Sequence, residues 1–385
     1  MTAREDPDLA DAGSLRVLFE ATWWEEGPPS LRRVLRESIL AWRRLYPADD
    51  LVLVVPRAAR LTAEAELGQA VTVRTTSLRP QAFAAMFGTI GPSAMLRPDV
   101  VFTQNFTSLA PRVPKVVLIH DLMFCEHPNW FTKAENAYFS LMPLTARFAS
   151  VVLATSSTES RRISRYLNRQ DVTPVGLGLS SDLKRLTPDP PERPVLPGLE
   201  SGQFVLSVGR LNARKNLVAT IEGALAADIL RTDFPLVVVG SPDGLQDSLP
   251  PTVREAIDKG LVRYTGFVDD EKLVWLYGNC RFFSFLSLDE GYGLPPLEAL
   301  HFGAPVLASD RPIFRELLGG LPNIHFCEPT EVAAISASMT TLAKSKTSQT
   351  LSPNSIVADR YTWDAVVARM RAAAVRVSRR RAGSA

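Results

Sequence analysis

The sequence predicts an α/β protein built from two Rossmann-like, doubly wound domains that face each other across a cleft. Its 385 residues exceed what one hydrophobic core usually supports, so two domains are expected. Short β-branched runs alternate with amphipathic segments, and this alternation favours parallel sheets covered by helices on both faces. The alternation pauses once, at a proline-rich stretch, and then starts again.

The first half of the chain contains six apolar runs that are typical of buried strands. Each run is bounded by turn-forming residues and lacks the alternation of a half-exposed strand. The expected strands are 15–19, 51–55, 71–75, 100–104, 115–120 and 151–155, and the expected crossover helices include 30–45 and 133–148. We therefore expect an N-terminal Rossmann-like domain over residues 1–185.

The second half repeats the pattern after a linker. The stretch 183–202 contains five prolines, which favour an extended linker over 186–202. Further strands are expected at 204–209, 236–240, 262–267, 280–286, 305–309 and 324–328. These strands predict a second Rossmann-like domain over 203–355, followed by a C-terminal helix in 356–385 that returns to the N-terminal domain.

Composition excludes several classes of protein. A formal net charge of +2 makes no global case for nucleic-acid binding, so no nucleic-acid partner is expected. Three widely spaced cysteines indicate reduced thiols in place of a disulfide framework or a metal site. The chain has no apolar run long enough to span a membrane, and its first residues are acidic and polar. A cytoplasmic protein is expected.

Basic residues follow the first strand of the second domain, in "LSVGRLNARKNL". Gly209 permits a tight exit from the strand, and Arg210 and Lys215 precede the next helix. Positive side chains at the carboxyl end of a strand, beside a helix N-terminus, are suited to bind an anion such as a phosphate. Taken alone, the two residues could equally be solvated loop charges.

Two glutamates flank a Gly- and Pro-containing turn in "DEGYGLPPLEA". Glu290 is expected at the carboxyl tip of a strand, and Glu298 about one turn into the following helix. A carboxylate at the second position suits vicinal hydroxyls such as those of ribose. Other readings are a helix-dipole partner for Glu298, a turn-capping role for Glu290, or a glycosidase-type carboxylate pair, which would leave the basic residues unexplained.

The chain resembles a retaining family 4 glycosyltransferase of GT-B architecture over nearly its whole length. The two glutamates match the family's E-x7-E motif, with Tyr292 in place of the usual Phe. "VGRLNARKNL" matches the family's "GRL…KN" element, and "VRYTGFVDDEKLVWLYGNC" resembles the stretch before the motif strand. "VVLIHDLMFCEHPNWF" and "ATSSTESRRI" resemble segments of bacterial mannosyltransferases that build surface polysaccharides.

The resemblance implies a nucleotide-sugar site in the second domain. Arg210 and Lys215 would bind the diphosphate, Glu298 the ribose hydroxyls and Glu290 the donor sugar. The amides of the adjoining loop would lie near the donor, and the base would lie against the segment before the motif strand. The remaining donor-binding positions implied are Gly291, Tyr292, Gly293, Leu294, Phe267 and Val268.

The resemblance also implies transfer with retention of configuration. In the usual front-face proposal, a leaving-group oxygen takes the proton of the acceptor, so no separate base is obligatory. His120, followed by Asp121, matches the residue that hydrogen-bonds the sugar or leaving group, although a lone His is more often structural. The implied catalytic set is Glu290, His120, Arg210 and Lys215. No Asp-x-Asp motif is present at a strand end, so neither a metal nor another cofactor is expected.

The acceptor side departs from the family pattern. The usual Gly-Gly turn after the first strand is replaced by Gly27 and two prolines, which lack amide donors. Trp23 and Trp24 could form a stacking platform for an acceptor sugar, or they could pack in the core. We expect the N-terminal domain to supply the acceptor side.

The donor and acceptor are expected by resemblance. GDP-mannose is the first choice of donor, with a dTDP-sugar or UDP-sugar as alternatives, and the acceptor would be a saccharide or glycolipid. Arginines of the 30–45 segment and a basic tail suggest contact with anionic lipid at the inner face of the membrane. The competing functions are a nucleotide-sugar 2-epimerase and a non-catalytic nucleotide-sugar-binding protein.

Overall fold

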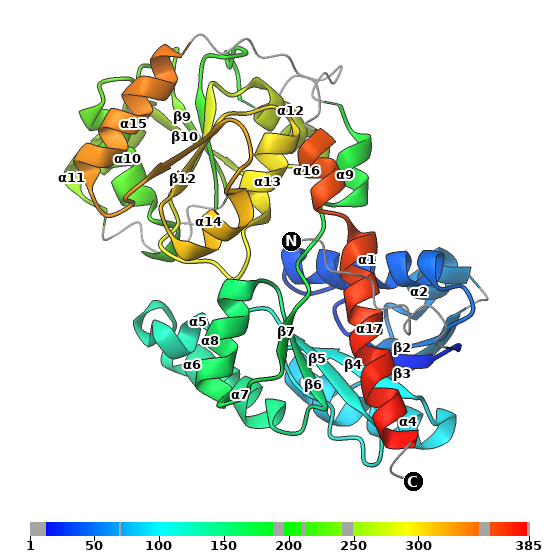
Figure 1. The fold of residues 1–385 in the computed structure, drawn as a ribbon. Coiled ribbons are helices and arrows are strands. Elements are labelled where there is room, and N and C mark those ends of the chain that lie inside the picture. Colours follow the sequence, from blue (N-terminus) through cyan, green and yellow to red (C-terminus); the bar gives the residue numbers. More distant parts are fainter. Residues whose placement is uncertain are drawn as a thin grey trace. The chain divides into compact units, whose positions relative to one another are not determined.

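A computed structural model of the chain describes residues 13–68, 71–187, 196–209, 213–240, 249–345 and 355–382. The chain divides into two compact units, each with its own parallel sheet (Figure 1). The N-terminal unit comprises Met1–Gly178 and Thr362–Ala385, and the C-terminal unit comprises Leu179–Tyr361. The prediction of two Rossmann-like α/β units is confirmed, whereas much of the expected 186–202 linker lies outside the described residues.

The N-terminal unit contains a seven-stranded parallel sheet in the order β3-β2-β1-β4-β5-β6-β7. The strands are β1 (Arg16–Glu20), β2 (Asp50–Pro56), β3 (Val71–Thr76), β4 (Val100–Gln104), β5 (Lys115–Ile119), β6 (Val151–Ala154) and β7 (Val172–Pro174). The central strands are almost wholly buried because helices cover both faces. The strand order reverses between β1 and β4, and ligands of such sheets bind beyond the carboxyl ends of the strands at that point.

Helices of the N-terminal unit follow the strands in crossover connections. They are α1 (Pro29–Leu45), α2 (Arg60–Leu67), α3 (Gln81–Phe83), α4 (Ile90–Leu96), α5 (Met123–Glu126), α6 (Lys133–Phe139), α7 (Leu141–Ala146), α8 (Ser157–Leu167) and α17 (Trp363–Ala382). A π-helical turn, Ala84–Gly88, and a 3-10 turn, Pro128–Trp130, complete the set of helical segments described here. The predicted helix 133–148 is divided at Ser140, and α6 begins with a capping box between Thr132 and Glu135.

The last helix of the chain completes the N-terminal unit. Helix α17, red in Figure 1, packs along α1 and also contacts β4 and β6. Arg371 of α17 donates two hydrogen bonds, of 2.8 and 2.9 Å, to the carboxylate of buried Asp49. Asp49 also accepts hydrogen bonds from the Trp42 indole and the backbone amide of Leu15, both at 2.9 Å. This buried carboxylate therefore ties the start of the sheet to the final helix.

The C-terminal unit contains a six-stranded parallel sheet in the order β10-β9-β8-β11-β12-β13. Its strands are β8 (Val205–Val208), β9 (Leu236–Val239), β10 (Val262–Gly266), β11 (Phe282–Phe285), β12 (Val306–Ser309) and β13 (Ile324–Cys327). Strands β8 and β11 are neighbours although β9 and β10 lie between them along the chain, so the order reverses between them. This reversal marks the expected ligand position of the second sheet.

The helices of the C-terminal unit enclose an aliphatic and aromatic core. They are α9 (Ser181–Arg185), α10 (Leu217–Ala226), α11 (Pro251–Asp258), α12 (Asp270–Asn279), α13 (Leu294–His301), α14 (Pro312–Leu318), α15 (Val332–Lys344) and α16 (Ser355–Arg360). A 3-10 turn, Ala213–Lys215, precedes α10. Helices α10 and α15 pack together, and their buried side chains join those of β8 and β9 in one cluster. This core supports the carboxyl ends of β8 and β11.

Across the residues that the structure describes, no helix has both the length and the apolar character needed to cross a bilayer.

Candidate functional site

The candidate site of the C-terminal unit begins where β8 and β11 end. The segment after β8 forms the 3-10 turn Ala213–Lys215, which carries two adjacent cations. The segment after β11 carries Glu290. Because β8 and β11 are neighbouring parallel strands, residues that follow them lie at the same edge of the sheet.

Glu290 forms ion pairs with both cations of that turn. Its Oε1 atom lies 2.7 Å from the Lys215 Nζ atom, and its Oε2 atom accepts a hydrogen bond from the Arg214 guanidinium. The three side chains are largely buried, with exposed fractions of 10% for Glu290, 17% for Lys215 and 23% for Arg214. The cluster holds two positive charges and one negative charge, so it retains an excess of positive charge at the sheet edge.

Burial and charge act in opposite directions on this cluster. Burial raises the pKa of Glu290, but Lys215 and Arg214 outweigh it and hold that pKa below the ordinary value for a glutamate. Burial lowers the pKa of Lys215, Glu290 opposes this effect, and Arg214 adds to it. The charged form of each partner is thus stabilised by the other.

The position of Lys215 depends on two neighbours. A Cβ atom at Gly209 would lie 3.1 Å from Cδ of Lys215, so the glycine leaves room for the lysine stem. The Lys215 Nζ atom lies 4.5 Å from the centre of the Phe285 ring, a cation–π contact at the end of β11. Glycine at the strand exit therefore serves the placement of the lysine beside Glu290.

Glu298 lies on the first turns of α13, apart from the ion cluster. It is 5% exposed, and its Oε2 atom accepts a hydrogen bond of 3.1 Å from the Tyr277 hydroxyl on α12. The helix begins after Gly293, which has a φ of 120°, and carries two prolines in its first turn, where backbone donors have no helical partner anyway. The structure thus places Glu290 and Glu298 in different surroundings.

The other residues expected at the donor site differ in exposure. Tyr292 and Val268 are buried, whereas Phe267 is 88% exposed at the end of β10. Arg210, expected to bind the diphosphate, lies outside the described residues. Gly291 lies in the segment that joins β11 to α13, and Leu294 is the first residue of α13.

Sequence reasoning missed Arg214. The residue directly precedes Lys215 in the sequence, and its guanidinium contacts the carboxylate that the motif singles out. The available signal was the run "NARKN", which places a second basic residue beside the lysine. A short turn at this point, which presents both cations to one carboxylate, is not evident from sequence alone.

The candidate site of the N-terminal unit centres on His120, which directly follows β5. Its backbone amide donates to Oδ1 of Asn105 at 3.1 Å, and its carbonyl accepts from the Thr155 hydroxyl at 3.0 Å. Its ring Nε2 atom lies 2.5 Å from Oε1 of Gln104. Residues after β4, β5 and β6 thus meet at the carboxyl edge of this sheet.

His120 is an uncharged residue in this environment. Burial lowers the pKa of its imidazole to about 3, so the ring is neutral near pH 7. The next residue, Asp121, accepts a hydrogen bond of 3.2 Å from the backbone amide of Met123. The buried Glu159 carboxylate accepts a 2.8 Å hydrogen bond from the amide of Leu122, which fixes the segment after His120.

The tryptophans expected on the acceptor side have different environments. Trp24 is fully buried, and the Arg36 guanidinium lies 4.9 Å from the centre of its ring. Of the two alternatives for Trp24, the structure shows packing in the core and excludes a stacking platform, because the ring is covered. Trp23 is half-buried. A Cβ atom at position 27 would lie only 2.3 Å from Cδ1 of the Trp23 ring, so the ring takes the space that a side chain there would need.

The arginines of α1 are engaged within the unit. Arg36 forms an ion pair with Glu66, and Arg44 forms one with Asp364 of α17. Arg32 donates a 2.6 Å hydrogen bond to the carbonyl of Glu25. This face of α1 therefore has fewer cations available to a lipid surface than the sequence suggests.

Glu20, at the end of β1, is a buried carboxyl group that sequence analysis did not single out. It accepts hydrogen bonds from the Thr22 amide at 2.7 Å and from the Gln81 side chain at 3.0 Å. Burial raises its pKa, and the hydrogen bonds from Thr22 and Gln81 oppose that effect. No sequence pattern marks a single glutamate at a strand end as buried.

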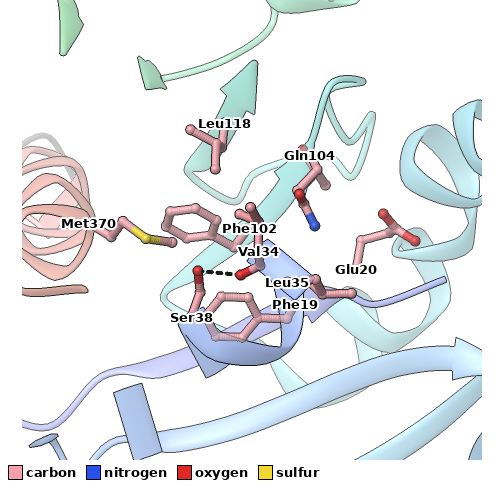
Figure 2. A pocket seen from close by; sticks show the side chains of 10 residues that line it. Phe19, Glu20, Val34, Leu35, Ser38, Phe102, Gln104, Leu118 and Met370 are labelled. Atoms are coloured by element: carbon pink, nitrogen blue, oxygen red, sulfur yellow. Dashed lines mark hydrogen bonds between the residues drawn. The ribbon is translucent and has the colours of Figure 1, made fainter. Parts of the chain in front are cut away.

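A small pocket of the N-terminal unit lies near this carboxyl group (Figure 2). Apart from Glu20, Ser38, Thr103 and Gln104 its lining is apolar, and the Ser38 hydroxyl donates to the carbonyl of Val34 at 2.7 Å. The apolar lining residues are Phe19, Val34, Leu35, Phe102, Leu118 and Met370. His120 does not line this pocket, which is a packing defect of the core and not a candidate substrate site.

Most of the C-terminal unit matches a known protein family in sequence. Residues 191–356 match the family model "Glycosyl transferases group 1". This region includes the Arg214–Lys215–Glu290 cluster and Glu298. The C-terminal unit therefore resembles a group 1 glycosyltransferase domain over these residues.

Bacterial mannosyltransferases are similar in sequence to this chain. The O-antigen chain mannosyltransferase B of Escherichia coli is 29% identical over 231 residues, which cover 58% of this chain and 59% of that protein. The serotype-specific mannosyltransferase WbdA of Escherichia coli is 34% identical over 120 residues, 30% of this chain and 15% of that protein. The matched part thus spans less than two thirds of the length of either relative.

A solved structure supports the same architecture for the whole chain. The HepE protein of Anabaena, in complex with UDP and glucose, aligns with a TM-score of 0.65 and 17% sequence identity. The alignment covers 93% of this chain and 98% of that protein. The chain is an α/β protein of GT-B architecture that resembles bacterial mannosyltransferases.

Proposed function

We propose that the protein is a retaining glycosyltransferase that moves mannose from GDP-mannose to a saccharide or lipid-linked saccharide. The product would extend a cell-surface polysaccharide or glycolipid. The observation that carries the proposal is the Arg214–Lys215–Glu290 cluster, which stands at the ends of β8 and β11 inside the glycosyltransferase domain.

The cations of the cluster suit a leaving diphosphate. As the glycosidic bond breaks, negative charge grows on the phosphate oxygens, and fixed positive groups at that point stabilise the transition state more than the ground state. Lys215 and Arg214 are held in place by Glu290 before any ligand binds, so little reorganisation is needed. Arg210 would add a further cation.

The two glutamates then have separate roles. Glu290 orients the cations on one side and contacts the donor sugar on the other. Glu298, fixed by the Tyr277 hydroxyl, accepts hydrogen bonds from the ribose hydroxyls. His120 hydrogen-bonds the transferred sugar, and a phosphate oxygen takes the proton of the acceptor hydroxyl.

Mannose is the proposed sugar because the two relatives described above are named mannosyltransferases. A UDP-sugar or dTDP-sugar is the alternative donor. The buried cations would stabilise the leaving diphosphate as a divalent metal does in other transferases, so we propose turnover without a metal. The acceptor side would be supplied by the N-terminal unit, at the cytoplasmic face of the membrane.

Thermal stabilisation of the full chain by nucleotides tests the donor site. GDP, UDP and dTDP and their sugars would be added in turn, each with EDTA or with magnesium. We expect one nucleotide to raise the melting temperature equally under both conditions, and Lys215→Met to abolish the shift. Lys259→Met, which removes a 62% exposed lysine of the same unit, is the matched control and should keep the shift.

Three results would count against the proposal. If no nucleotide at millimolar concentration changes the melting temperature of the wild-type protein, the site is not a nucleotide-sugar site. If the shift requires magnesium, the metal-independent mechanism is wrong. If the bound nucleotide sugar is converted to its 2-epimer without an acceptor, the protein is an epimerase.

A further inference from the structure

We propose that Gln104 fixes His120 as a neutral imidazole protonated at Nε2, so that Nδ1 accepts a hydrogen bond from a substrate hydroxyl. The inference rests on the proposed function, in which His120 contacts the sugar, and specifies which atom makes that contact and with what chemistry. Gln104 is a positioning residue in this account, since it acts only through the ring of His120.

Two consecutive residues, the last of β4 and the one that follows it, hold the ring and the backbone of His120. Oε1 of Gln104 lies 2.5 Å from Nε2, and Oδ1 of Asn105 accepts the backbone amide of His120 at 3.1 Å. Asn105 has a φ of 60°, a left-handed conformation that asparagine tolerates better than most residues. The Thr155 hydroxyl secures the carbonyl of His120 from the other neighbouring strand.

Gln104 is itself held in place. The Gln81 side-chain amide donates to the backbone carbonyl of Gln104 at 2.9 Å and to Glu20 at 3.0 Å. Gln104, Gln81 and Glu20 are each at most 5% exposed. Figure 2 shows the Gln104 and Glu20 side chains at the ends of their strands, beside the apolar pocket. The backbone that carries the Gln104 side chain is therefore tied into a buried polar network, and burial restricts the side chain that faces the His120 ring.

The amide oxygen of Gln104 selects the tautomer. An amide oxygen can only accept a hydrogen bond, so the ring nitrogen that faces it carries the proton. In a neutral imidazole, Nδ1 is then an acceptor with a lone pair. No hydrogen bond joins Nδ1 to another described residue, and the residue retains 8% exposure.

This protonation state restricts what His120 can recognise. A neutral ring with a lone pair at Nδ1 pairs with a donor such as a sugar hydroxyl, and repels the oxygens of a phosphate. Burial, which lowers the imidazole pKa to about 3, also makes the ring too weak a base to remove the proton of an acceptor. His120 would therefore orient a hydroxyl and would neither bind the diphosphate nor act as a general base.

Nuclear magnetic resonance of the full chain with ¹⁵N-labelled histidine tests the tautomer directly. The protein has four histidines, and His120→Asn identifies the signals of the residue concerned. We expect one protonated and one unprotonated ring nitrogen in the wild-type protein, with the proton on Nε2 and no change between pH 5 and pH 8. A proton on Nδ1 would overturn the inference.

Two substitutions test the role of Gln104. Gln104→Leu removes the acceptor, so the proton should redistribute between the two ring nitrogens. Gln104→Glu keeps an acceptor and adds a negative charge, so both nitrogens should become protonated below neutral pH. Gln170→Glu adds the same charge at an exposed position of the same unit and should leave the His120 signals unchanged. Unchanged signals in Gln104→Leu and Gln104→Glu would also overturn the inference.

Turnover measurements separate the inference from the proposed function. If a nucleotide-sugar donor is found, Gln104→Leu should lower kcat roughly tenfold, the scale typical of removing a group that orients a histidine, with KM for the donor changed far less. Turnover together with a proton on Nδ1 would refute the inference alone. If the ring is protonated at Nε2 but the protein binds no nucleotide sugar, the proposed function is refuted. The assignment of a sugar hydroxyl as the partner of Nδ1 is then refuted as well.

Discussion

Replacing Glu290 with Gln removes the carboxylate that pairs with two buried cations. The substitution keeps the shape of the side chain and one hydrogen-bond acceptor, but it leaves Arg214 and Lys215 side by side without a counter-charge. We expect two opposite effects. The C-terminal unit should become less stable, and the site should bind the diphosphate of a nucleotide more tightly, because the two cations are freed to pair with it.

The loss of stability follows from the geometry. A hydrogen bond between charged groups contributes roughly 1.5–3 kcal/mol, and breaking a buried ion pair costs about 3–5 kcal/mol. The cations retain exposed fractions of 17% and 23%, so water partly replaces the carboxylate. We therefore expect the free energy of unfolding to fall by about 2–4 kcal/mol, equivalent to about 5–15 °C in melting temperature for a domain of this size.

Thermal and urea unfolding would be measured for the wild type, Glu290→Gln and Glu328→Gln. Each would be measured with and without the nucleotide that raises the melting temperature in the thermal-stabilisation panel. Glu328 is a matched control because Arg311 donates two hydrogen bonds to it, at 2.7 and 2.8 Å, in the same unit. Its side chain is 35% exposed, so the control should lose less stability and leave nucleotide affinity unchanged. An equal loss in both variants, or weaker nucleotide binding in Glu290→Gln, would refute the reasoning.

The pH dependence gives an independent check on the same cluster. The pKa of Glu290 is lower in the folded protein than its ordinary value of 4.5. The contribution of the Glu290 ion pairs to the free energy of unfolding is thus fully present when the pH is above 4.5. It is lost as the pH falls through the lowered pKa of the folded protein. The difference in unfolding free energy between wild type and Glu290→Gln should shrink only below about pH 4.5; a difference that shrinks between pH 6 and pH 8 would contradict the ion-pair account.

Three further predictions follow from contacts described above. Gly209→Ala places a Cβ atom against Lys215 at a φ of 155°, which residues with a side chain rarely adopt, so nucleotide affinity should fall about tenfold and the melting temperature should fall as well, both measured by calorimetry; unchanged affinity would show that Lys215 does not contact the nucleotide. Glu298→Ala should remove the preference for GDP over 2′,3′-dideoxy-GDP, and Tyr277→Phe should weaken that preference about fivefold, equivalent to about 1 kcal/mol. Burial raises the pKa of Glu159 to about 8, so wild type should lose unfolding free energy relative to Glu159→Gln as the pH rises from about 4.5 to 8, and parallel pH profiles would exclude that effect.

Much of the fold could be predicted because the strands are continuous apolar runs. A parallel sheet buried on both faces requires such runs, and helices between them fix the topology within narrow limits. Strand β7 escaped prediction because it has only three residues, Val172–Pro174, and lies at the sheet edge. The break in the helix at Ser140 has a mark in the sequence, Pro143, which is tolerated in the first turn of α7 but not in the interior of one long helix. The prediction of one helix over 133–148 overlooked this proline.

The candidate site was predictable only where local spacing carries the chemistry. Glu290, Glu298 and Lys215 stand in motifs with fixed spacing, whereas Gln104 meets His120 across neighbouring strands, 16 residues away. Trp24 could not be placed from sequence, because an aromatic residue after a strand is equally suited to a core and to a ligand platform. Its burial depends on helix α1, which brings Arg36 over the ring.

The closure of the N-terminal unit by α17 has a consequence for biosynthesis. Residues 179–361 are synthesised before helix α17. The ribosome therefore completes the C-terminal unit before Asp49 can pair with Arg371. The nascent N-terminal unit must wait with its α1 surface uncovered until that helix emerges. A premature stop that removes only α17 would therefore damage the unit that was translated first, and the C-terminal unit would be left intact.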